Sequence, residues 1–145
     1  LVLLKVHHVF PSIGPIRRWR MDGFDYAKSA DVDQVMGAFF CIRRDVLERI
    51  GPLDDDFFMW YEEVDFCRRT VKAGWRVRYF SDISAKHKKG SSFDRVPTIT
   101  KQAMLRRSVR SYMRKHYGVI IGGVFWILEP VFSLFALLAS AIKPM

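Results

Sequence analysis

The chain has 145 residues, of which 50% are hydrophobic and 27% charged, so it is globular rather than disordered and has room for one domain with an appendage. Its two cysteines, Cys41 and Cys67, form no C-x-x-C pair, which argues against a disulfide framework or a zinc knuckle and favours a reduced, cytosolic environment. The net charge of +9 predicts an anionic partner, which could be nucleic acid, a phospholipid surface or a phosphorylated substrate.

The N-terminal part of the chain has the pattern of a sheet protein. Residues 1–6 resemble a strand already under way, and no signal peptide precedes them, so we expect the chain to be part of a longer protein. The apolar run at residues 35–42 predicts a buried strand. Within that run, Gly37 and Ala38 leave room for a ligand or for tight strand packing.

Two helices and a loop come next. Residues 44–50 predict a short helix closed by Gly51 and Pro52, and residues 54–58 predict a loop. Apolar residues at helical spacing then predict an amphipathic helix, with acidic residues in its first turn, that ends at Gly74. These apolar residues are Trp60, Val64, Cys67 and Val71.

The rest of the chain predicts one strand, a basic helix and an apolar tail. Residues 75–80 alternate as in a strand, and residues 99–117 have the pattern of an amphipathic helix. One face of this helix carries Leu105, Val109, Tyr112 and Met113, and the other carries Arg106, Arg107, Arg110 and Arg114. Residues 119–142 are almost wholly apolar apart from Glu129 and Pro130.

The apolar tail and the basic helix before it favour contact with a membrane. Because Glu129 and Pro130 argue against a straight crossing, we expect a Pro-kinked span or two short interfacial helices that leave Glu129 near water. A buried helix pair in the core is the alternative. We expect the four arginines and Trp126 to bind an anionic surface at the cytoplasmic face of the plasma (inner) membrane. Nucleic-acid binding is disfavoured because no recognisable motif accompanies the basic face.

Carboxylates gather around the start of the helix expected after the loop at residues 54–58. They are Asp54, Asp55, Asp56, Glu62, Glu63 and Asp65. The positive end of a helix dipole stabilises ionised carboxylates near its N-terminus. Such groups at the edge of a cleft can accept protons or bind a metal.

Six stretches that together span most of residues 31–118 form a pattern by their order and spacing. They are residues 32–38, 42–44, 53–69, 72–75, 87–92 and 112–118. Taken together, they resemble the glycosyltransferase family 2 enzymes of the GT-A fold, especially the rhamnosyltransferase-like members that build bacterial surface polysaccharides. The resemblance implies an α/β fold: the C-terminal, acceptor-side portion of a GT-A type mixed sheet with flanking helices at residues 1–98. A basic amphipathic helix at residues 99–118 and a hydrophobic helical tail at residues 119–145 follow.

The resemblance also implies an inverting sugar transfer, in which a carboxylate at the start of this helix deprotonates the acceptor hydroxyl. The matching residue is Glu63, although the family more often shows Glu-Asp where this chain has Glu62 and Glu63. Glu62 would be its neighbour at the acceptor pocket. Asp65 is a reserve candidate, for which intrahelical ion pairs with Arg68 and Arg69 are the alternative.

Further site residues follow from the same resemblance. Gly37, Ala38, Asp56 and Trp60 are expected to contact substrate. His87 matches a histidine that binds the divalent metal, Mn²⁺ or Mg²⁺, at the nucleotide diphosphate; the alternative is a surface histidine.

The donor-binding half of such enzymes is not recognised in this sequence. The aspartates at residues 54–56 are not the nucleotide-binding D-x-D motif, which belongs to an earlier strand, and they more simply cap a loop or contact the acceptor. The signature of processive relatives is also missing, so we expect transfer of one or a few sugars, with rhamnose as a candidate. The donor would be a nucleotide-sugar and the acceptor a cell-envelope or lipid-linked glycan.

By itself the chain should therefore be nearly inactive, and it would work with a missing N-terminal half or as a homo-oligomer. A noncatalytic membrane-surface remnant or partner-binding module is the alternative function.

Overall fold

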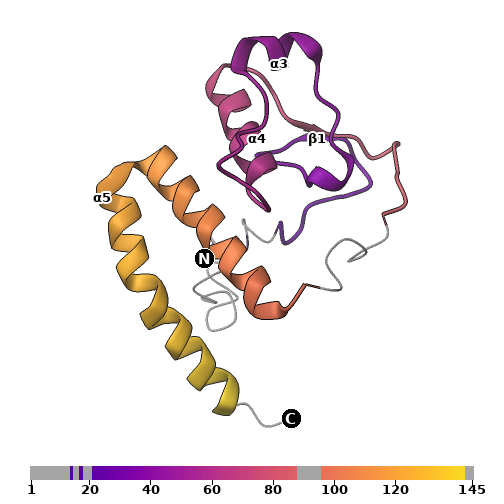
Figure 1. Cartoon of the computed structure of the whole chain (residues 1–145). Helices are drawn as coiled ribbons and strands as arrows, with labels where there is room; N and C mark the ends of the chain where they lie inside the picture. Colours follow the sequence, from indigo (N-terminus) through magenta and orange to yellow (C-terminus); the bar gives the residue numbers. More distant parts are fainter. Residues whose placement is uncertain (1–13, 15–16, 18–20, 88–95, 143–145) are drawn as a thin grey trace. The chain divides into compact units, whose positions relative to one another are not determined.

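The structure is a computed structural model that describes residues 14, 17, 21–87 and 96–142, with the side chains of residues 132, 133 and 135–142 left out. The strand expected at residues 1–6 lies outside the described residues. The described chain divides into two compact units, one formed by Asp25–Tyr112 and the other containing residues 113–142 (Figure 1).

The first unit contains a small antiparallel sheet. Strand β1 is Ala30–Asp31 and strand β2 is Arg78–Tyr79, with Ala30 opposite Tyr79 and Asp31 opposite Arg78. The strand expected at residues 75–80 is thus confirmed only at Arg78 and Tyr79. The unit is a mixture of helices and strands, as the expected α/β class requires; the larger GT-A type sheet stays a prediction.

The segment at residues 35–42 was wrongly predicted as a buried strand. It contains a short 3-10 helix, η1, at Gly37–Phe39, and Met36 and Phe39 are exposed. Only part of the run turns inward: the Phe40 ring packs edge-on against Phe66 at a centroid distance of 5.7 Å. The apolar density of the run correctly indicated contact with the core, but the contact is made by single side chains rather than by a strand.

The two helices expected next are confirmed. Helix α3 is Arg44–Ile50 and helix α4 is Glu62–Lys72. Gly51 and Gly74, with φ angles of 80° and 86°, follow their C-termini, as expected from the freedom of glycine to adopt positive φ. Helix α4 buries Phe66 and Cys67, but Val71, which was expected on its apolar face, is exposed. Residues 54–58 form no helix or strand.

Arg69 of helix α4 forms an ion pair within its own helix and also bonds to the end of helix α3. Asp65 is fully buried and accepts a hydrogen bond of 2.8 Å from Nε of Arg69, one turn further along α4. The other two guanidinium nitrogens of Arg69 donate to the carbonyl oxygens of Ile50 and Pro52, each at 2.7 Å. One arginine therefore satisfies carbonyl groups at the end of α3, which no helical bond can reach.

Helix α5 runs from Thr98 to Ile142 and is kinked at Gly118, whose φ of 88° and ψ of 168° are not helical. Its first part confirms the helix expected at residues 99–117. Ser108 and Val109 are buried there. The basic face is less uniform than expected, because Arg107 is exposed whereas Arg106 and Arg110 are half-buried.

The second unit contains the rest of α5. Close contact follows from the kink: a β-carbon added to Gly122 would lie 3.2 Å from Cα of Arg114. The prediction that Glu129 lies near water is wrong, because this residue is only 1% exposed, and the helix continues past Pro130.

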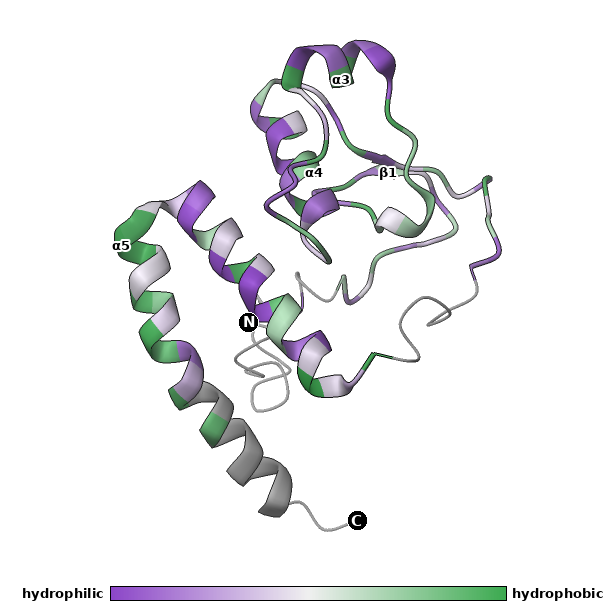
Figure 2. Cartoon of the chain, viewed as in Figure 1, coloured by the Kyte–Doolittle hydropathy of each residue, from purple (hydrophilic) through white to green (hydrophobic). Residues whose placement is uncertain are grey.

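Beyond Gly118 the coloured part of α5 consists mostly of hydrophobic residues (Figure 2). Between residues 119 and 134, the exposed residues whose side chains are described are Gly123, Pro130 and residues with apolar side chains. Trp126 is one of these apolar residues. In the part of the chain that the structure describes, no helix combines the length and the hydrophobicity needed to cross a membrane.

Candidate active site

Two carboxylates occupy the first turn of α4. Glu62 and Glu63 are half-buried residues, and the Oε2 atom of each is buried without a hydrogen-bond partner among the described residues. Burial raises the pKa of the Glu63 carboxyl above its usual range, and the negative charge of Glu62 adds to the effect. A buried acceptor atom without a donor is costly in a folded protein. The pair is therefore suited to take a proton, or to accept a hydrogen bond, from a bound molecule.

Helix η1 lies against Glu63. A β-carbon built on Gly37 would lie 3.8 Å from Cβ and 3.9 Å from Cδ of Glu63, so the glycine is in direct contact with this side chain. The backbone N–H of Gly37 also interacts with the carboxyl group and opposes the rise of its pKa. Gly37 and Glu63, both named as site residues in the sequence analysis, are thus neighbours, and their roles stay predictions.

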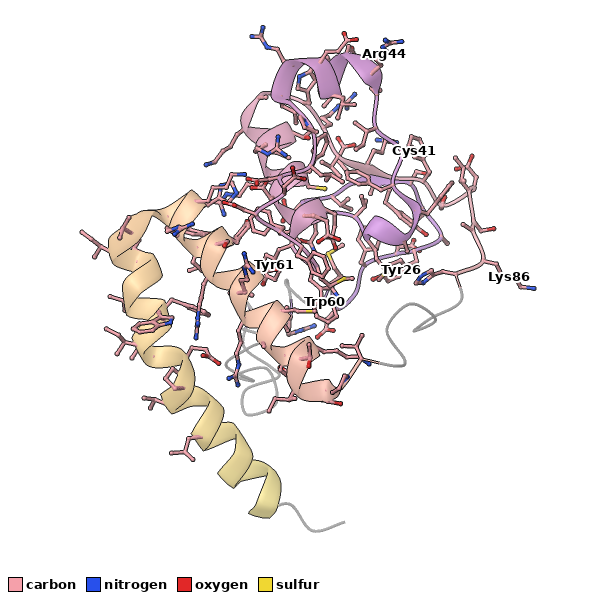
Figure 3. The ribbon with its side chains drawn as sticks, in the orientation of Figure 1. Tyr26, Cys41, Arg44, Trp60, Tyr61 and Lys86 are labelled. Atoms are coloured by element: carbon pink, nitrogen blue, oxygen red, sulfur yellow. The ribbon has the colours of Figure 1, made fainter. Side chains whose placement is uncertain are left out.

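The residues directly before α4 have an uncommon backbone. Trp60 and Tyr61 have φ angles of 60° and 76°, the left-handed region that bulky side chains rarely adopt. Each such residue costs on the order of 1–3 kcal/mol, and such strain persists only where its surroundings enforce it. Figure 3 shows both side chains at the entrance to α4, and Trp60 is half-buried.

The first part of α5 supports this strained loop. The Ser108 hydroxyl donates to the carbonyl oxygen of Met59 at 2.7 Å. The Tyr112 ring packs edge-on against Tyr61 at a centroid distance of 5.2 Å, and Nη1 of Arg68 donates to its hydroxyl oxygen at 3.1 Å. The loop is thus held at Met59 and at Tyr61, on either side of Trp60.

The other sequence-predicted residues are placed as follows. Ala38 is exposed in the middle of η1, and Asp56 is exposed in the loop, where its N–H donates to Oδ1 of Asp54 at 2.9 Å. The loop-capping role expected for this aspartate cluster is thus confirmed for Asp54. Asp65 forms the expected intrahelical ion pair, with Arg69, and points away from solvent.

His87 is exposed, and the rest of the loop in which it was expected to act lies outside the described residues. In the described ranges 21–87 and 96–142, no three side chains of His, Cys, Asp or Glu form a group that could hold a metal ion. The described residues therefore do not make a complete metal site, and His87 could supply only one ligand of such a site.

Sequence reasoning missed the supporting residues Tyr61, Ser108 and Tyr112. Tyr112 begins one of the stretches that carry the family resemblance, so its position was marked but its role was not. Nothing in the local pattern signals a left-handed tyrosine, because the contacts that hold Tyr61 come from α5, far along the chain.

Comparison with known families decides the assignment of the chain. Residues 6–144 match the family described as Glycosyl transferase family group 2. The chain belongs to this family. The family resemblance found in the sequence is therefore confirmed.

Two curated relatives of this glycosyl transferase family are informative. N-acetylglucosaminyl-diphospho-decaprenol L-rhamnosyltransferase from Mycobacterium tuberculosis is 33% identical over 103 residues, which cover 71% of this chain and 34% of that protein. Low-salt glycan biosynthesis hexosyltransferase Agl10 from Haloferax volcanii is 36% identical over 56 residues, which cover 39% of this chain and 18% of that protein. The chain thus spans about a third or less of the relatives that it matches. No solved structure matches it.

Proposed function

We propose that this chain carries the acceptor-side catalytic half of an inverting glycosyltransferase, with Glu63 as general base. The observation that carries the proposal is the Glu63 carboxyl group itself. It lies at the first turn of α4, beside Gly37, and one of its oxygens is buried and available to a hydrogen-bond donor of a bound molecule. A raised pKa makes it a stronger base than an ordinary glutamate, which suits proton transfer near neutral pH.

The proposed reaction needs one proton acceptor and one leaving group. A Glu63 carboxylate oxygen takes the proton of an acceptor hydroxyl, whose oxygen forms a bond to the anomeric carbon of the sugar. The bond from that carbon to the diphosphate breaks on the opposite side, so the configuration inverts and a nucleoside diphosphate leaves. The longer side chain of Glu63, compared with the aspartate common in the family, must still reach hydrogen-bond distance of the hydroxyl.

The names of the relatives suggest the substrates. One is named for transferring rhamnose to a lipid-linked N-acetylglucosamine and the other for glycan biosynthesis. We propose a nucleotide-sugar donor, with rhamnose as a candidate sugar, and a lipid-linked or cell-envelope glycan as acceptor. The donor-binding residues would be contributed by a further part of the protein, and His87 would be one ligand of a Mn²⁺ or Mg²⁺ ion. No step above depends on that ion, because the described residues do not complete its site.

We also propose that the protein acts at the cytoplasmic face of the plasma (inner) membrane. The exposed surface of α5 beyond Gly118 carries no charged side chain among its described residues up to 134. Such a surface is suited to lie in the interface between water and lipid. The exposed guanidinium groups of Arg107 and Arg114 would favour anionic lipids, and half-buried Arg106 and Arg110 would contribute less.

Substitution of Glu63 tests the proposed chemistry. Transfer from labelled nucleotide-sugars to lipid-linked acceptors would be measured in a preparation that also supplies the donor-binding half. We expect Glu63→Gln to reduce turnover by at least about 100-fold, because an amide cannot take the proton, and Glu63→Asp to retain measurable turnover. Glu48→Gln, on the exposed surface of α3, is the matched control. Turnover of Glu63→Gln equal to that of the unaltered protein would assign the base to another residue.

A further inference from the structure

The start of α4 is not fixed by an ordinary capping residue. Tyr61 occupies the N-cap position, with φ 76° and ψ −8°, and makes no side-chain capping hydrogen bond. Helices more often begin with Ser, Thr, Asp or Asn in extended conformation, whose side chain accepts a bond from the first turn. Something other than local sequence must hold Trp60 and Tyr61 in the left-handed region.

The contacts that hold this conformation come from one face of α5. Ser108 and Tyr112 are four residues apart, so they lie one above the other on the helix. Ser108 is buried and bonds the carbonyl oxygen before Trp60, while Tyr112 packs on Tyr61. Arg68 of α4 completes the arrangement, because it donates to the Tyr112 hydroxyl and its guanidinium carbon lies 5.6 Å from the centre of the Tyr112 ring.

The direction in which the chain enters α4 determines where its first two side chains point. Glu62 and Glu63 follow Tyr61 directly, and the Asp65 N–H donates to the Tyr61 carbonyl oxygen at 2.8 Å, so Tyr61 is tied to the first helical turn. A relaxation of Tyr61 to an extended conformation would rotate this turn relative to Gly37. The contact between Gly37 and Glu63 would then be lost.

We propose that Ser108 and Tyr112 are positioning residues, which hold the left-handed Trp60–Tyr61 loop so that the Glu63 carboxylate stays against Gly37 in the orientation that proton transfer requires. The role in transfer rests on the proposed function of Glu63. The role in orientation does not, and it can be measured on the chain without any substrate. In this arrangement α5 is part of the catalytic machinery rather than only a link to the apolar tail.

The first experiment measures the titration of the Glu63 carboxyl carbon by NMR in the 145-residue chain. The neighbouring titratable groups are Glu62 and Tyr61 beside it in the chain and Cys67 one turn along α4. We expect Tyr112→Leu and Ser108→Ala each to lower the pKa of Glu63 toward its ordinary value, because the released carboxyl group becomes solvated. We expect Tyr112→Phe, which keeps the ring, to leave most of the effect intact.

Gln102→Ala is the matched control, because Gln102 is exposed on the same helix. Thermal unfolding identifies any variant that does not fold, and Ser108→Ala removes only one oxygen, so at least one variant remains usable. A Glu63 pKa that is unchanged in every folded variant would overturn the positioning role.

The second experiment measures transfer by the same variants in a preparation that supplies the donor-binding half. We expect kcat to fall about 100-fold in Tyr112→Leu, with KM nearly unchanged, and to recover largely in Tyr112→Phe. The acid limb of the pH–rate profile should move to lower pH, which a loss of stability alone would not cause. If every variant kept normal transfer, the inference would be overturned. Normal transfer by Glu63→Gln would overturn the proposed function instead.

Discussion

At the scale of single residues, the Glu63 carboxyl group combines features that conflict in a purely structural residue. It lies at a helix N-terminus, which favours its charged form, yet burial and the charge of Glu62 favour its neutral form. Burial outweighs the interaction with the Gly37 N–H, since the pKa is raised. A residue selected only for stability would not retain a half-buried carboxylate with an unsatisfied oxygen.

The raised pKa of Glu63 predicts a dependence of stability on pH. A group whose pKa is higher in the folded state stabilises the fold below its unfolded pKa, and this contribution is lost as pH rises through the folded pKa. Glu63→Gln should therefore raise the unfolding temperature at pH 7 to 8. Its difference in unfolding temperature from the unaltered protein should vanish at about pH 4, where both side chains are neutral. Differential scanning calorimetry measures this, with Glu48→Gln as control. A lower unfolding temperature of Glu63→Gln at pH 8 would contradict it.

Part of the site was predictable from the sequence at this scale. Acidic residues in the first turn of a helix are a local signal, but only the family resemblance singled out Glu63 among them. A glycine in an apolar run indicates a close approach, and Gly37 does lie close to Glu63. The orientation of Glu63 was not predictable. It depends on an unfavourable backbone conformation of two aromatic residues and on contacts from α5, and no local propensity encodes either.

At the scale of elements, both helices were predictable because glycines mark the ends of α3 and α4, and because apolar residues recur at helical spacing in α4. The run at residues 35–42 did not, because a short apolar run can belong to a strand or to a segment that contacts the core at single points. Here Phe40 packs inward and Met36 and Phe39 stay exposed, so the density of apolar residues was misleading.

The buried ion pair between Asp65 and Arg69 should dominate the stability of the α3–α4 packing. Asp65→Ala would leave a mostly buried guanidinium group without its carboxylate, which costs about 3 kcal/mol. Glu48→Ala removes the exposed Arg44–Glu48 pair and should cost less than about 1 kcal/mol. Urea denaturation followed by circular dichroism compares the two. Equal losses of stability would show that the buried pair has no special weight.

At the scale of the whole molecule, the chain joins a unit with a chemical site to a helix with an apolar surface. The sequence predicted the apolar character of residues 119–142 but placed Glu129 near water, because the expected break at Glu129 and Pro130 would have exposed it. The break occurs instead at Gly118, and Glu129 is buried. Because Glu129 is buried, no acidic side chain is exposed among the described side chains of residues 113–134.

The apolar surface predicts binding to lipid vesicles. Ile120 and Ile127 are 83% and 64% exposed. Replacing both with Ser should weaken sedimentation with phosphatidylcholine–phosphatidylglycerol vesicles by roughly tenfold or more, because each substitution removes apolar area that lipid binding would bury. Ile83→Ser, at an exposed isoleucine of the first unit, is the matched control. Vesicles of phosphatidylcholine alone should bind less, and sedimentation unaffected by the double substitution would exclude this surface from lipid contact.

Along a straight helix, Arg114 and Gly122 would be about 12 Å apart. A β-carbon at Gly122 would instead nearly touch the Arg114 backbone, because Gly118 adopts angles that are open essentially only to glycine. A single methyl group at residue 118 would therefore favour an unbroken rod and pull these two positions apart. The carboxyl group of Glu129 would then return toward solvent, and the apolar surface of the helix would regain a charge.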